Sequence, residues 1–503
     1  MEALSIEEIA QAVGGRILQG DGNYRITSVS TNSKNLEPGA LFVPIVGEKV
    51  DAHGYIDDAF ANGAAACFTS RPETVLPEHI YIAVEDTLAA LQALGSWYRG
   101  RFSVPVIGIT GSVGKTTTKE MVAAAFMTGY NVLKTEGNMN SQVGLPLMML
   151  RLNPCHQIAV IEMGMSEEGE MAKLTAIAKP EAAIMTNIGV SHIGQLKTKE
   201  NIRKEKLNII NAFGEHSKLY INGNDTLLAD IYYSRYPDRK DSSAASRSSF
   251  QAESGQKAGI DISAVTAGAL KNADVVAFGT ESFCGYRAED IRMKDGKTYF
   301  NLVTDHGNEE EIELQVLGIH NVYNALAALA AAEQYGIPAS VAKEGLRLYQ
   351  PIAMRGQILE LNQVKIIDDS YNASPDSMKS GIQVLMELEG VTRRIAVLAD
   401  VLELGEQSYQ CHYEVGTYIA GQKVDEVVTV GSEAAYIAQA IQDKNPAVVT
   451  HSFQRNEEAS AYLKSTVRAG DAVLVKGSRS MRTDEIVRAL SGGPAQQDIP
   501  VNG

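Results

Sequence analysis

The sequence has few cysteines, and none of them stands in a spacing typical of a zinc site. Cys67, Cys155, Cys284 and Cys411 are scattered along the 503 residues, and no C-x-x-C occurs. This pattern excludes the common cysteine-rich metal sites. We expect four buried, free thiols in a protein of a reducing compartment.

Positive charge is also scarce. The chain has 45 Lys and Arg against 61 Asp and Glu, a net charge of −16. This balance argues against non-specific binding to nucleic acid or to an anionic membrane. An anionic substrate must therefore be held by local donors and metal ions, because the surface as a whole does not attract it.

Long apolar runs are missing as well. No stretch of about 18 apolar residues occurs, and Met1–Gly14 lacks the basic region and apolar core of a signal peptide. Composition is otherwise that of a globular protein, with 45% hydrophobic residues. We expect a cytoplasmic, monomeric protein without membrane insertion and without a nucleic-acid partner.

The length predicts about three α/β domains, each with its own core. We place a small N-terminal domain at 1–103, a central domain at 104–352 and a Rossmann-like domain at 353–491, followed by a disordered tail at 492–503. In the central domain strands alternate with helices, which predicts a doubly wound, mostly parallel sheet. The serine-rich residues 241–259 predict a mobile surface insertion.

Short apolar runs locate the elements of each domain. Strands are expected at 26–30, 41–45, 65–69 and 80–84, then at 104–109, 158–163, 182–187, 218–222, 274–278, 297–304 and 311–316, and finally at 365–368, 395–398, 426–430 and 472–475. The helices that bear on function are expected at 119–127, 200–211 and 321–335. Ligands of such sheets gather at the carboxyl ends of the strands.

The most informative segment is G-I-T-G-S-V-G-K-T-T-T, Gly108–Thr118, which lies between a β-branched run and a helical pattern. Backbone N–H groups of such a loop bind phosphate, its lysine reaches the β- and γ-phosphates, and the next hydroxyl can ligate Mg²⁺. Ile109 stands where the common pattern has its first glycine. The alternative is a glycine turn before an ordinary helix, but the segment favours ATP or GTP binding. The predicted contacts are Thr110, Gly111, Ser112, Val113, Gly114, Lys115, Thr116 and Thr117.

Two side chains that follow central strands bear on the phosphate site. Glu162 ends I-A-V-I-E, and His192 follows another strand in N-I-G-V-S-H-I. Taken singly, a surface carboxylate and a structural histidine are the commoner roles. Because both are expected at the carboxyl edge of the sheet, they are candidates to reach Mg²⁺ near the γ-phosphate.

Two helices carry further candidates. Lys206 lies within 200–211, where nothing local distinguishes it from Lys204. A very apolar helix opens with three polar side chains, His320, Asn321 and Asn324. A helix cap explains one asparagine but not two on one face.

Polar residues also follow strands of the third domain. Residues 366–378 begin with a strand that ends in polar residues ahead of a helix begun by Pro375, and two more strands end at Asp400 and Lys476. A turn capped by Ser374 or Asn372 is the simpler explanation for the first of these segments. Three such strand ends in one domain favour a binding cleft.

Together these motifs resemble the Mur ligases, a family of ATP-dependent, amide-forming enzymes of peptidoglycan synthesis. The matching pieces are T-G-S-V-G-K-T-T-T (110–118), E-G-N-M-N-S-Q-V-G-L-P (136–146), the E-M-G at Glu162, N-I-G-V-S-H-I (187–193), H-N-V-Y-N-A-L-A-A (320–328), M-R-G-Q (354–357), D-D-S-Y-N-A-S-P-D-S (368–377), D-V-L-E-L-G (400–405) and K-G-S-R (476–479). The missing first glycine of the phosphate loop is itself a feature of this family. Residues 31–55 resemble the family's UDP-binding domain.

One segment separates members of the family. D-D-S-Y-N-A-S-P resembles the member that joins D-Ala-D-Ala to UDP-N-acetylmuramoyl-tripeptide. The member that adds the third peptide residue usually has Tyr-x-His-x-Pro there and an Asp-Asn-Pro motif further on. Asn372 stands where that histidine would be, and no Asp-Asn-Pro occurs. Alternatives are that third-residue ligase, a folate-glutamate ligase, or, from another class, a nucleotide-switch protein.

The resemblance implies that ATP phosphorylates the terminal carboxylate of the tripeptide and that the amine of D-Ala-D-Ala attacks the acyl phosphate. A tetrahedral intermediate then collapses to amide, ADP and phosphate. The protein's task is positioning and charge neutralisation. Two Mg²⁺ ions are implied, held by Thr116, Glu162, His192 and Lys206, with Lys206 carbamylated. Lys115, Glu162, His192 and Lys206 are the implied catalytic residues.

The resemblance also implies the binding residues. Further ATP contacts are Asn321, Asn324, Arg355 and Asp369. The implied contacts to the peptide substrates are Asn138, Asn140, Ser141, Tyr371, Asn372, Ser374, Lys476 and Arg479. The uridine-nucleotide end is assigned to Ser33, Lys34 and His53. Closure of the third domain over ATP is expected.

Overall fold

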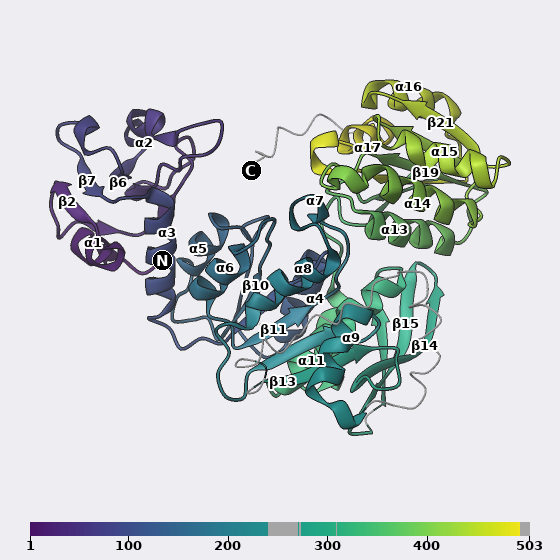
Figure 1. The fold of residues 1–503 in the computed structure, drawn as a ribbon, viewed down its shortest axis with the longest axis horizontal. Coiled ribbons are helices and arrows are strands. Elements are labelled where there is room, and N and C mark those ends of the chain that lie inside the picture. The colour runs from purple at the N-terminus through teal and green to yellow at the C-terminus, as the bar shows by residue number, and fades with distance from the viewer. Residues whose placement is uncertain (240–269, 271–272, 308, 493–503) are drawn as a thin grey trace.

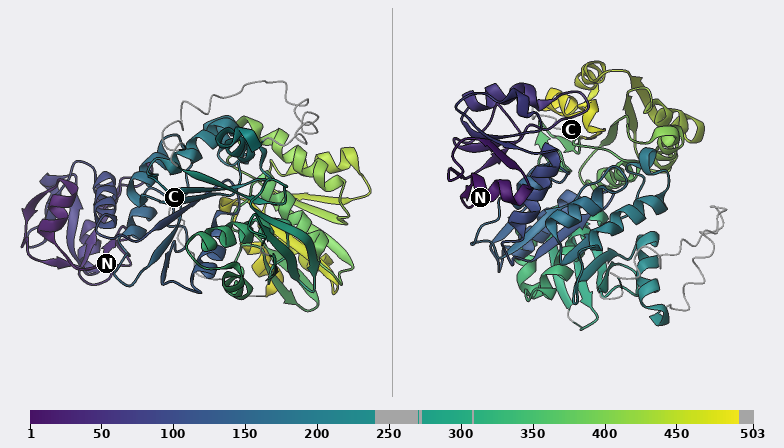
Figure 2. Two further views of the ribbon diagram at one scale, coloured as in Figure 1. Left: turned by 90° about the horizontal axis from the view of Figure 1, so that it is seen from below. Right: turned by 60° about the vertical axis from the view of Figure 1, so that its left-hand side comes forward.

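Figure 1 shows a computed structural model of the chain, in which three α/β units follow one another. The structure describes residues 1–239, 270, 273–307 and 309–492. The insertion predicted at 241–259 and the tail predicted beyond residue 492 lie outside these residues. The N-terminal and third units lie on either side of the middle unit (Figure 2).

The N-terminal unit is a five-stranded sheet in the order β2-β7-β6-β5-β4, in which only β2 runs antiparallel to its neighbour. A separate pair is formed by β1 (Leu4–Ser5) and β3 (Arg25–Ile26). The other elements are α1 (Ile6–Val13), β2 (Arg16–Gln19), β4 (Val29–Ser30), β5 (Ala40–Phe42), α2 (Ile56–Ala61), β6 (Ala64–Thr69), β7 (Ile80–Ala83) and α3 (Thr87–Arg99).

Helix α3 ties this unit to the next one. The Tyr98 hydroxyl donates to the Leu152 carbonyl at 2.9 Å, and Arg99 donates to the carbonyls of Ala178 and Val104. Both side chains are buried. The first two units therefore share a packed and hydrogen-bonded junction.

The middle unit is a nine-stranded sheet in the order β16-β15-β14-β13-β12-β11-β8-β10-β9. The pairs from β9 to β14 are parallel, and the pairs β14–β15 and β15–β16 are antiparallel. The strands are β8 (Val106–Thr110), β9 (Val132–Lys134), β10 (Ile158–Glu162), β11 (Ala182–Met185), β12 (Lys218–Asn222), β13 (Asp274–Gly279), β14 (Tyr286–Lys294), β15 (Lys297–Thr304) and β16 (Glu309–Leu314).

Two helices enclose one face of this sheet, and both approach the phosphate loop. α4 packs against α11, whose small side chains are nearly all buried, so the two axes approach closely. The helices of the unit are α4 (Lys115–Phe126), α5 (Gly144–Met149), α6 (Glu170–Ala178), α7 (Ile193–Leu196), α8 (Lys199–Leu207), α9 (Thr226–Arg235), α11 (Ile319–Gln334) and α12 (Ala339–Leu348).

The third unit is a six-stranded sheet in the order β17-β18-β22-β19-β20-β21, parallel except for β17. Its strands alternate with helices, as expected of a Rossmann-like unit. The elements are β17 (Gln357–Leu361), β18 (Val364–Asp368), α13 (Pro375–Glu387), β19 (Arg393–Ala399), α14 (Ser408–Ala420), β20 (Glu426–Val430), α15 (Ala435–Lys444), β21 (Val449–Phe453), α16 (Asn456–Thr466), β22 (Asp471–Lys476) and α17 (Asp484–Ser491).

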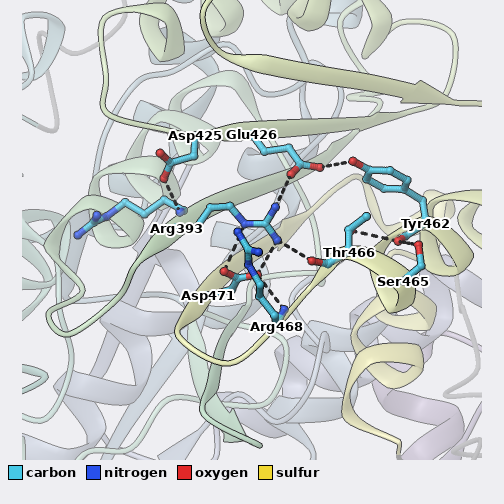
Figure 3. Close-up of polar contacts among 9 residues, drawn as sticks. Arg393, Asp425, Glu426, Tyr462, Ser465, Thr466, Arg468 and Asp471 are labelled. Atoms are coloured by element: carbon cyan, nitrogen blue, oxygen red, sulfur yellow. Dashed lines mark hydrogen bonds and ion pairs between the residues drawn. The ribbon is translucent and has the colours of Figure 1, made fainter.

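A network centred on Arg393 joins the amino ends of three strands of this sheet (Figure 3). The guanidinium binds Asp471 at 2.6 Å, Glu426 at 3.1 Å and the Thr466 carbonyl at 2.8 Å. Tyr462 donates to the other oxygen of Glu426. Because substrates of such sheets bind at the opposite, carboxyl edge, this network is a structural feature rather than a site.

The structure confirms the α/β class and the mostly parallel central sheet, and it corrects several details. The edge strands β2, β9, β17 and β21 and the interior strand β14 were not predicted, and the strand expected at 26–30 is split into β3 and β4. Helix α4 begins at Lys115, not at 119. Cys155 is exposed, whereas the other three thiols are buried.

Two further expectations concern the limits and the surroundings of the units. The boundaries predicted at 103 and 352 fall between α3 and β8 and between α12 and β17, and they stay predictions. None of the described helices combines the length and the apolar character needed to cross a membrane.

Candidate active site

The glycine-rich segment forms a tight loop between β8 and α4. Gly111 and Gly114 have φ values of 152° and 86°. A Cβ at Gly111 would lie 1.9 Å from the Thr186 hydroxyl, and one at Gly114 would lie 3.1 Å from the Asn324 amide oxygen. Neighbouring side chains therefore leave room only for glycine at Gly111, and the positive φ favours it at Gly114.

A residue that the sequence did not single out holds this loop in place. The amide oxygen of Asn187 accepts from the N–H groups of Ser112 and Val113, at 3.1 and 2.8 Å. The Thr186 hydroxyl donates to the Val113 carbonyl at 2.5 Å. Asn187 begins the same N-I-G-V-S-H segment that carries His192, so its position after β11 was the available signal.

Two lysines converge on one carbonyl oxygen of the loop. Lys115 and Lys206 donate to the Gly111 carbonyl at 2.9 and 3.0 Å. Burial lowers the pKa of Lys206 well below its usual value, and the nearby Lys115 lowers it further. Burial also lowers the pKa of Lys115, against the attraction of Glu162. Lys206, which no local pattern distinguished, therefore lies directly behind the phosphate loop.

Glu162 ends β10 beside the loop, and only one of its two carboxylate oxygens bonds to a described residue. Oε1 accepts from the Asn140 amide at 2.7 Å, whereas Oε2 is buried and bonds to no described residue. Thr116, in the first turn of α4, lines the same cavity as Glu162. A buried carboxylate oxygen without a partner is costly unless a cation or a donor occupies the space beside it.

His192 lies across the boundary between the middle and third units. It precedes α7 in the left-handed region, with φ of 63°, and its Nδ1 lies 2.9 Å from Oε2 of Glu403. The hydrogen bond from His192 is the largest cause that lowers the pKa of Glu403. Glu403 belongs to the D-V-L-E-L-G segment that resembles the Mur ligases, but the sequence predicts no role for this residue.

The asparagine pair at the start of α11 faces α4. The Asn324 oxygen accepts from the Thr118 hydroxyl at 2.8 Å, and its amide donates to Asn321 at 3.3 Å. The neighbouring His320 is half-buried, desolvation lowers its pKa to about 4, and its buried Nδ1 has no partner among the described residues. All three side chains line the main cavity.

The third unit supplies a stack of cationic and aromatic groups. The Arg355 guanidinium lies 3.8 Å from the centroid of the Tyr371 ring, and that of Arg479 lies 5.8 Å from it. Lys476 is buried and pairs with Asp369 at 2.5 Å, and it donates to the Asn372 carbonyl at 3.0 Å. These contacts hold in place the segments that follow β18 and β22.

A cavity of about 820 Å³ joins the phosphate loop to the third unit. The predicted residues that line it are Ser112, Val113, Gly114, Lys115, Thr116, Thr117, Asn138, Asn140, Ser141, Glu162, Asn321, Asn324, Arg355, Asp369, Tyr371, Asn372, Ser374 and Lys476. The structure thus brings together residues from both units in one space large enough for a nucleotide.

Other predicted residues lie outside the lining of this cavity. Thr110, Gly111, Lys206, His192 and Arg479 lie behind or beside it. Asp400 does not join the cleft expected at the strand ends, because its carboxylate accepts from the Ala434 N–H and so holds the start of α15.

The residues assigned to the uridine end lie in the N-terminal unit. The buried His53 has both ring nitrogens engaged, with Asp51 at 2.8 Å and with Ser70 at 3.2 Å. The Ser33 carbonyl accepts from Asn62. His53 therefore has a structural role in its own loop, whatever it contacts in addition.

Family models for the Mur ligases match three stretches of the chain. The model described as "Mur ligase family, catalytic domain" matches residues 25–99, and "Mur ligase middle domain" matches 109–257 and 257–332. The model described as "Mur ligase, glutamate ligase domain" matches residues 354–479. Each model falls within one of the three units.

Known proteins match over almost the whole chain. The UDP-N-acetylmuramoyl-tripeptide–D-alanyl-D-alanine ligase of Bacillus subtilis is 35% identical over 97% of this chain and 99% of its own. A crystal structure of MurF from Acinetobacter baumannii superposes with a TM-score of 0.84 at 27% identity, covering 98% of this chain and 100% of that one. The MurF ligase of Thermotoga maritima, solved in complex with ADP, gives a TM-score of 0.75 at 27% identity and covers 92% and 97%.

Proposed function

This chain belongs to the Mur ligase family, and we propose that it joins D-Ala-D-Ala to UDP-N-acetylmuramoyl-tripeptide, with ATP converted to ADP and phosphate. Relatives named for this reaction match the chain almost from end to end. The observation that carries the proposal is the single cavity that joins the phosphate loop to Tyr371, Asn372 and Ser374 of the third unit.

The proposed reaction makes a poor electrophile reactive. The terminal carboxylate of the tripeptide takes the γ-phosphoryl group, and the amine of D-Ala-D-Ala displaces phosphate through a tetrahedral intermediate. Catalysis of this kind depends on in-line positioning and on donors aimed at the phosphate oxygens. Lys115 and the first N–H groups of α4 are the donors that this chain offers there.

The donor set fits Mg²⁺, which would neutralise negative charge on the phosphate. Glu162 offers its buried, unpartnered Oε2, and Thr116 offers a hydroxyl in the same cavity. Among the described residues no group of three or more His, Cys, Asp and Glu side chains forms a metal cage. Such sparse protein ligation is usual for Mg²⁺, which keeps waters and substrate phosphates as its other ligands. We assign a second ion to the neighbourhood of His192.

We further propose that Lys206 is carbamylated. A lysine reacts with CO₂ as the neutral amine, and burial beside Lys115 favours that form because it lowers the pKa of Lys206. The carbamate would turn a repelling cation behind the loop into an anionic oxygen ligand. This change would also relieve the repulsion between Lys115 and Lys206.

The remaining substrate contacts are assigned by position. Arg355 and Tyr371 stack together over the cavity, and Lys476 is held by Asp369 next to Asn372. These residues suit the nucleotide and the peptide ends, whereas Ser33 and Lys34 are assigned to the distant uridine end. None of the cysteines is paired, which supports a cytoplasmic site of action.

An assay of ADP formation tests the proposal. ADP is expected only when both UDP-N-acetylmuramoyl-tripeptide and D-Ala-D-Ala are present, and Lys115→Ala should abolish it while the circular dichroism spectrum is retained. Tripeptides ending in meso-diaminopimelate and in L-lysine should both be offered. ATP hydrolysis that responds to neither substrate would favour a nucleotide switch. Normal turnover by Lys115→Ala would contradict the phosphate-loop assignment.

A further inference from the structure

The turn that contains Glu403 docks on the segment that contains His192. The Gly194 N–H donates to the Glu403 carbonyl at 3.2 Å, and the Gln407 amide donates to the Lys197 carbonyl at 3.3 Å. A Cβ at Gly194 would lie 3.0 Å from that Glu403 carbonyl. The third unit therefore contacts α7 backbone to backbone, and a side chain at Gly194 would crowd the contact.

This docking brings a carboxylate to the predicted metal-site histidine. Oε2 of Glu403 lies 2.9 Å from Nδ1 of His192. No described residue bonds Nε2, and the His192 side chain is 19% exposed. An imidazole that donates Nδ1–H to a carboxylate carries its lone pair on Nε2, which is then the nitrogen that can bind a metal ion.

These contacts join two units of the chain. Glu403 and Gln407 come from the third unit, whereas His192, Gly194 and Lys197 come from the middle unit. The position of the Glu403 carboxylate beside His192 therefore depends on how the third unit docks.

We propose that Glu403 is a positioning residue, which accepts Nδ1–H of His192 and presents Nε2 to the metal ion only when the third unit is docked. This inference rests on the proposed function, in which His192 meets a metal ion. It adds that docking of the third unit completes the metal site in the middle unit. His192 is the residue before the short helix α7, and the contact that the structure shows for its ring is the one with Glu403.

Four variants test this role: Glu403→Ala, Glu403→Gln, Glu406→Ala and Gln407→Ala. Glu406 is an exposed carboxylate on the same turn, and Gln407 makes the neighbouring contact between the units without touching His192. Mn²⁺ is the probe, titrated by electron paramagnetic resonance against enzyme saturated with a non-hydrolysable ATP analogue. The kcat and the KM for ATP are measured in parallel.

Glu403→Ala should weaken Mn²⁺ binding about 10-fold and lower kcat about 10- to 100-fold, as expected for the carboxylate behind a metal-bound histidine. The KM for ATP should change less than about twofold, because Lys115 and the loop amides are untouched. Glu403→Gln should recover part of the Mn²⁺ affinity, since its amide oxygen still accepts from Nδ1–H. Both controls should resemble the wild type.

Wild-type Mn²⁺ affinity in Glu403→Ala would overturn the proposal. An equal loss of Mn²⁺ affinity in Gln407→Ala would also overturn it, because Glu403 would then only help to hold the two units together. Melting temperatures identify any variant that fails to fold. If Glu403→Ala does not fold, Glu403→Gln provides the test. The Mn²⁺ titration does not depend on the acceptor. A failure of D-Ala-D-Ala to stimulate ADP formation would therefore contradict the proposed function alone.

Discussion

Glu387 is a buried acid whose ionisation should destabilise the third unit. It is the last residue of α13, and its Oε2 is buried without a partner among the described residues. Burial raises its pKa from 4.5 to about 7. A carboxylate at a helix carboxyl end is also repelled by the free carbonyls there. Glu387→Gln keeps the shape of the side chain and removes the charge.

The sign follows from proton linkage. Between pH 4.5 and about 7 the folded state binds more protons at Glu387 than the unfolded state, so stability falls as pH rises through this window. The full shift corresponds to about 3 kcal/mol at pH 8. The side chain is not fully enclosed, and solvent screening should reduce this to about 1 to 2 kcal/mol.

Scanning calorimetry of the full chain from pH 5 to pH 8 measures the effect. Glu387→Gln should melt close to the wild type at pH 5 and about 3 to 8 °C higher at pH 8, in the transition of the third unit. Glu406→Gln, which removes an exposed carboxylate of the same unit, is the control and should follow the wild type at every pH. Parallel pH profiles for Glu387→Gln and the wild type would refute the reasoning.

Two further predictions concern Lys206 and Arg393. Lys206→Ala should be inactive and partly rescued by short-chain carboxylic acids, and a folded variant that is not rescued would count against the carbamate. Wild-type activity should fall as the pH drops below the lowered pKa of Lys206, because protonation removes the amine that reacts with CO₂. Arg393→Ala leaves the buried carboxylates of Asp471 and Glu426 unpaired and should destabilise the third unit by about 3 kcal/mol in urea titrations. Arg393→Lys should recover part of this loss, and an unchanged urea midpoint for Arg393→Ala would show that the network is dispensable.

The parts of the site that directly follow a strand were predictable. The phosphate loop, Glu162 and the strand end at Asp369 follow strands whose apolar runs are plain in the sequence. Parallel strands place their carboxyl ends at one edge of a sheet, so topology brought the phosphate loop and Glu162 together, whereas Asp369 lies in the sheet of the third unit. Lys206 needed the family resemblance, because helix α8 carries several lysines and only packing shows which one is buried.

The parts that depend on contacts between segments could not be predicted. Asn187 and Glu403 act on neighbours far away in sequence, and an asparagine or glutamate after a strand has many ordinary explanations. The strand β14 was missed because its apolar alternation is interrupted where its register with β15 shifts, between Glu289 and Arg292. The contacts of His53 with Asp51 and Ser70 depend on a loop and were not predicted, whereas its assignment to the uridine end stays a prediction.

The first glycine that the loop lacks has a physical explanation in this fold. Ile109 is fully buried and pairs with Ile184 of β11 and Glu162 of β10, so this position belongs to the strand β8 and not to the loop. Asn187 already occupies the N–H groups of Ser112 and Val113. The first N–H groups of α4 have no intrahelical partner, and Gly114 provides no side-chain cap. Phosphate should therefore bind at the start of α4 and at Lys115, in the cavity that Arg355 of the third unit also lines.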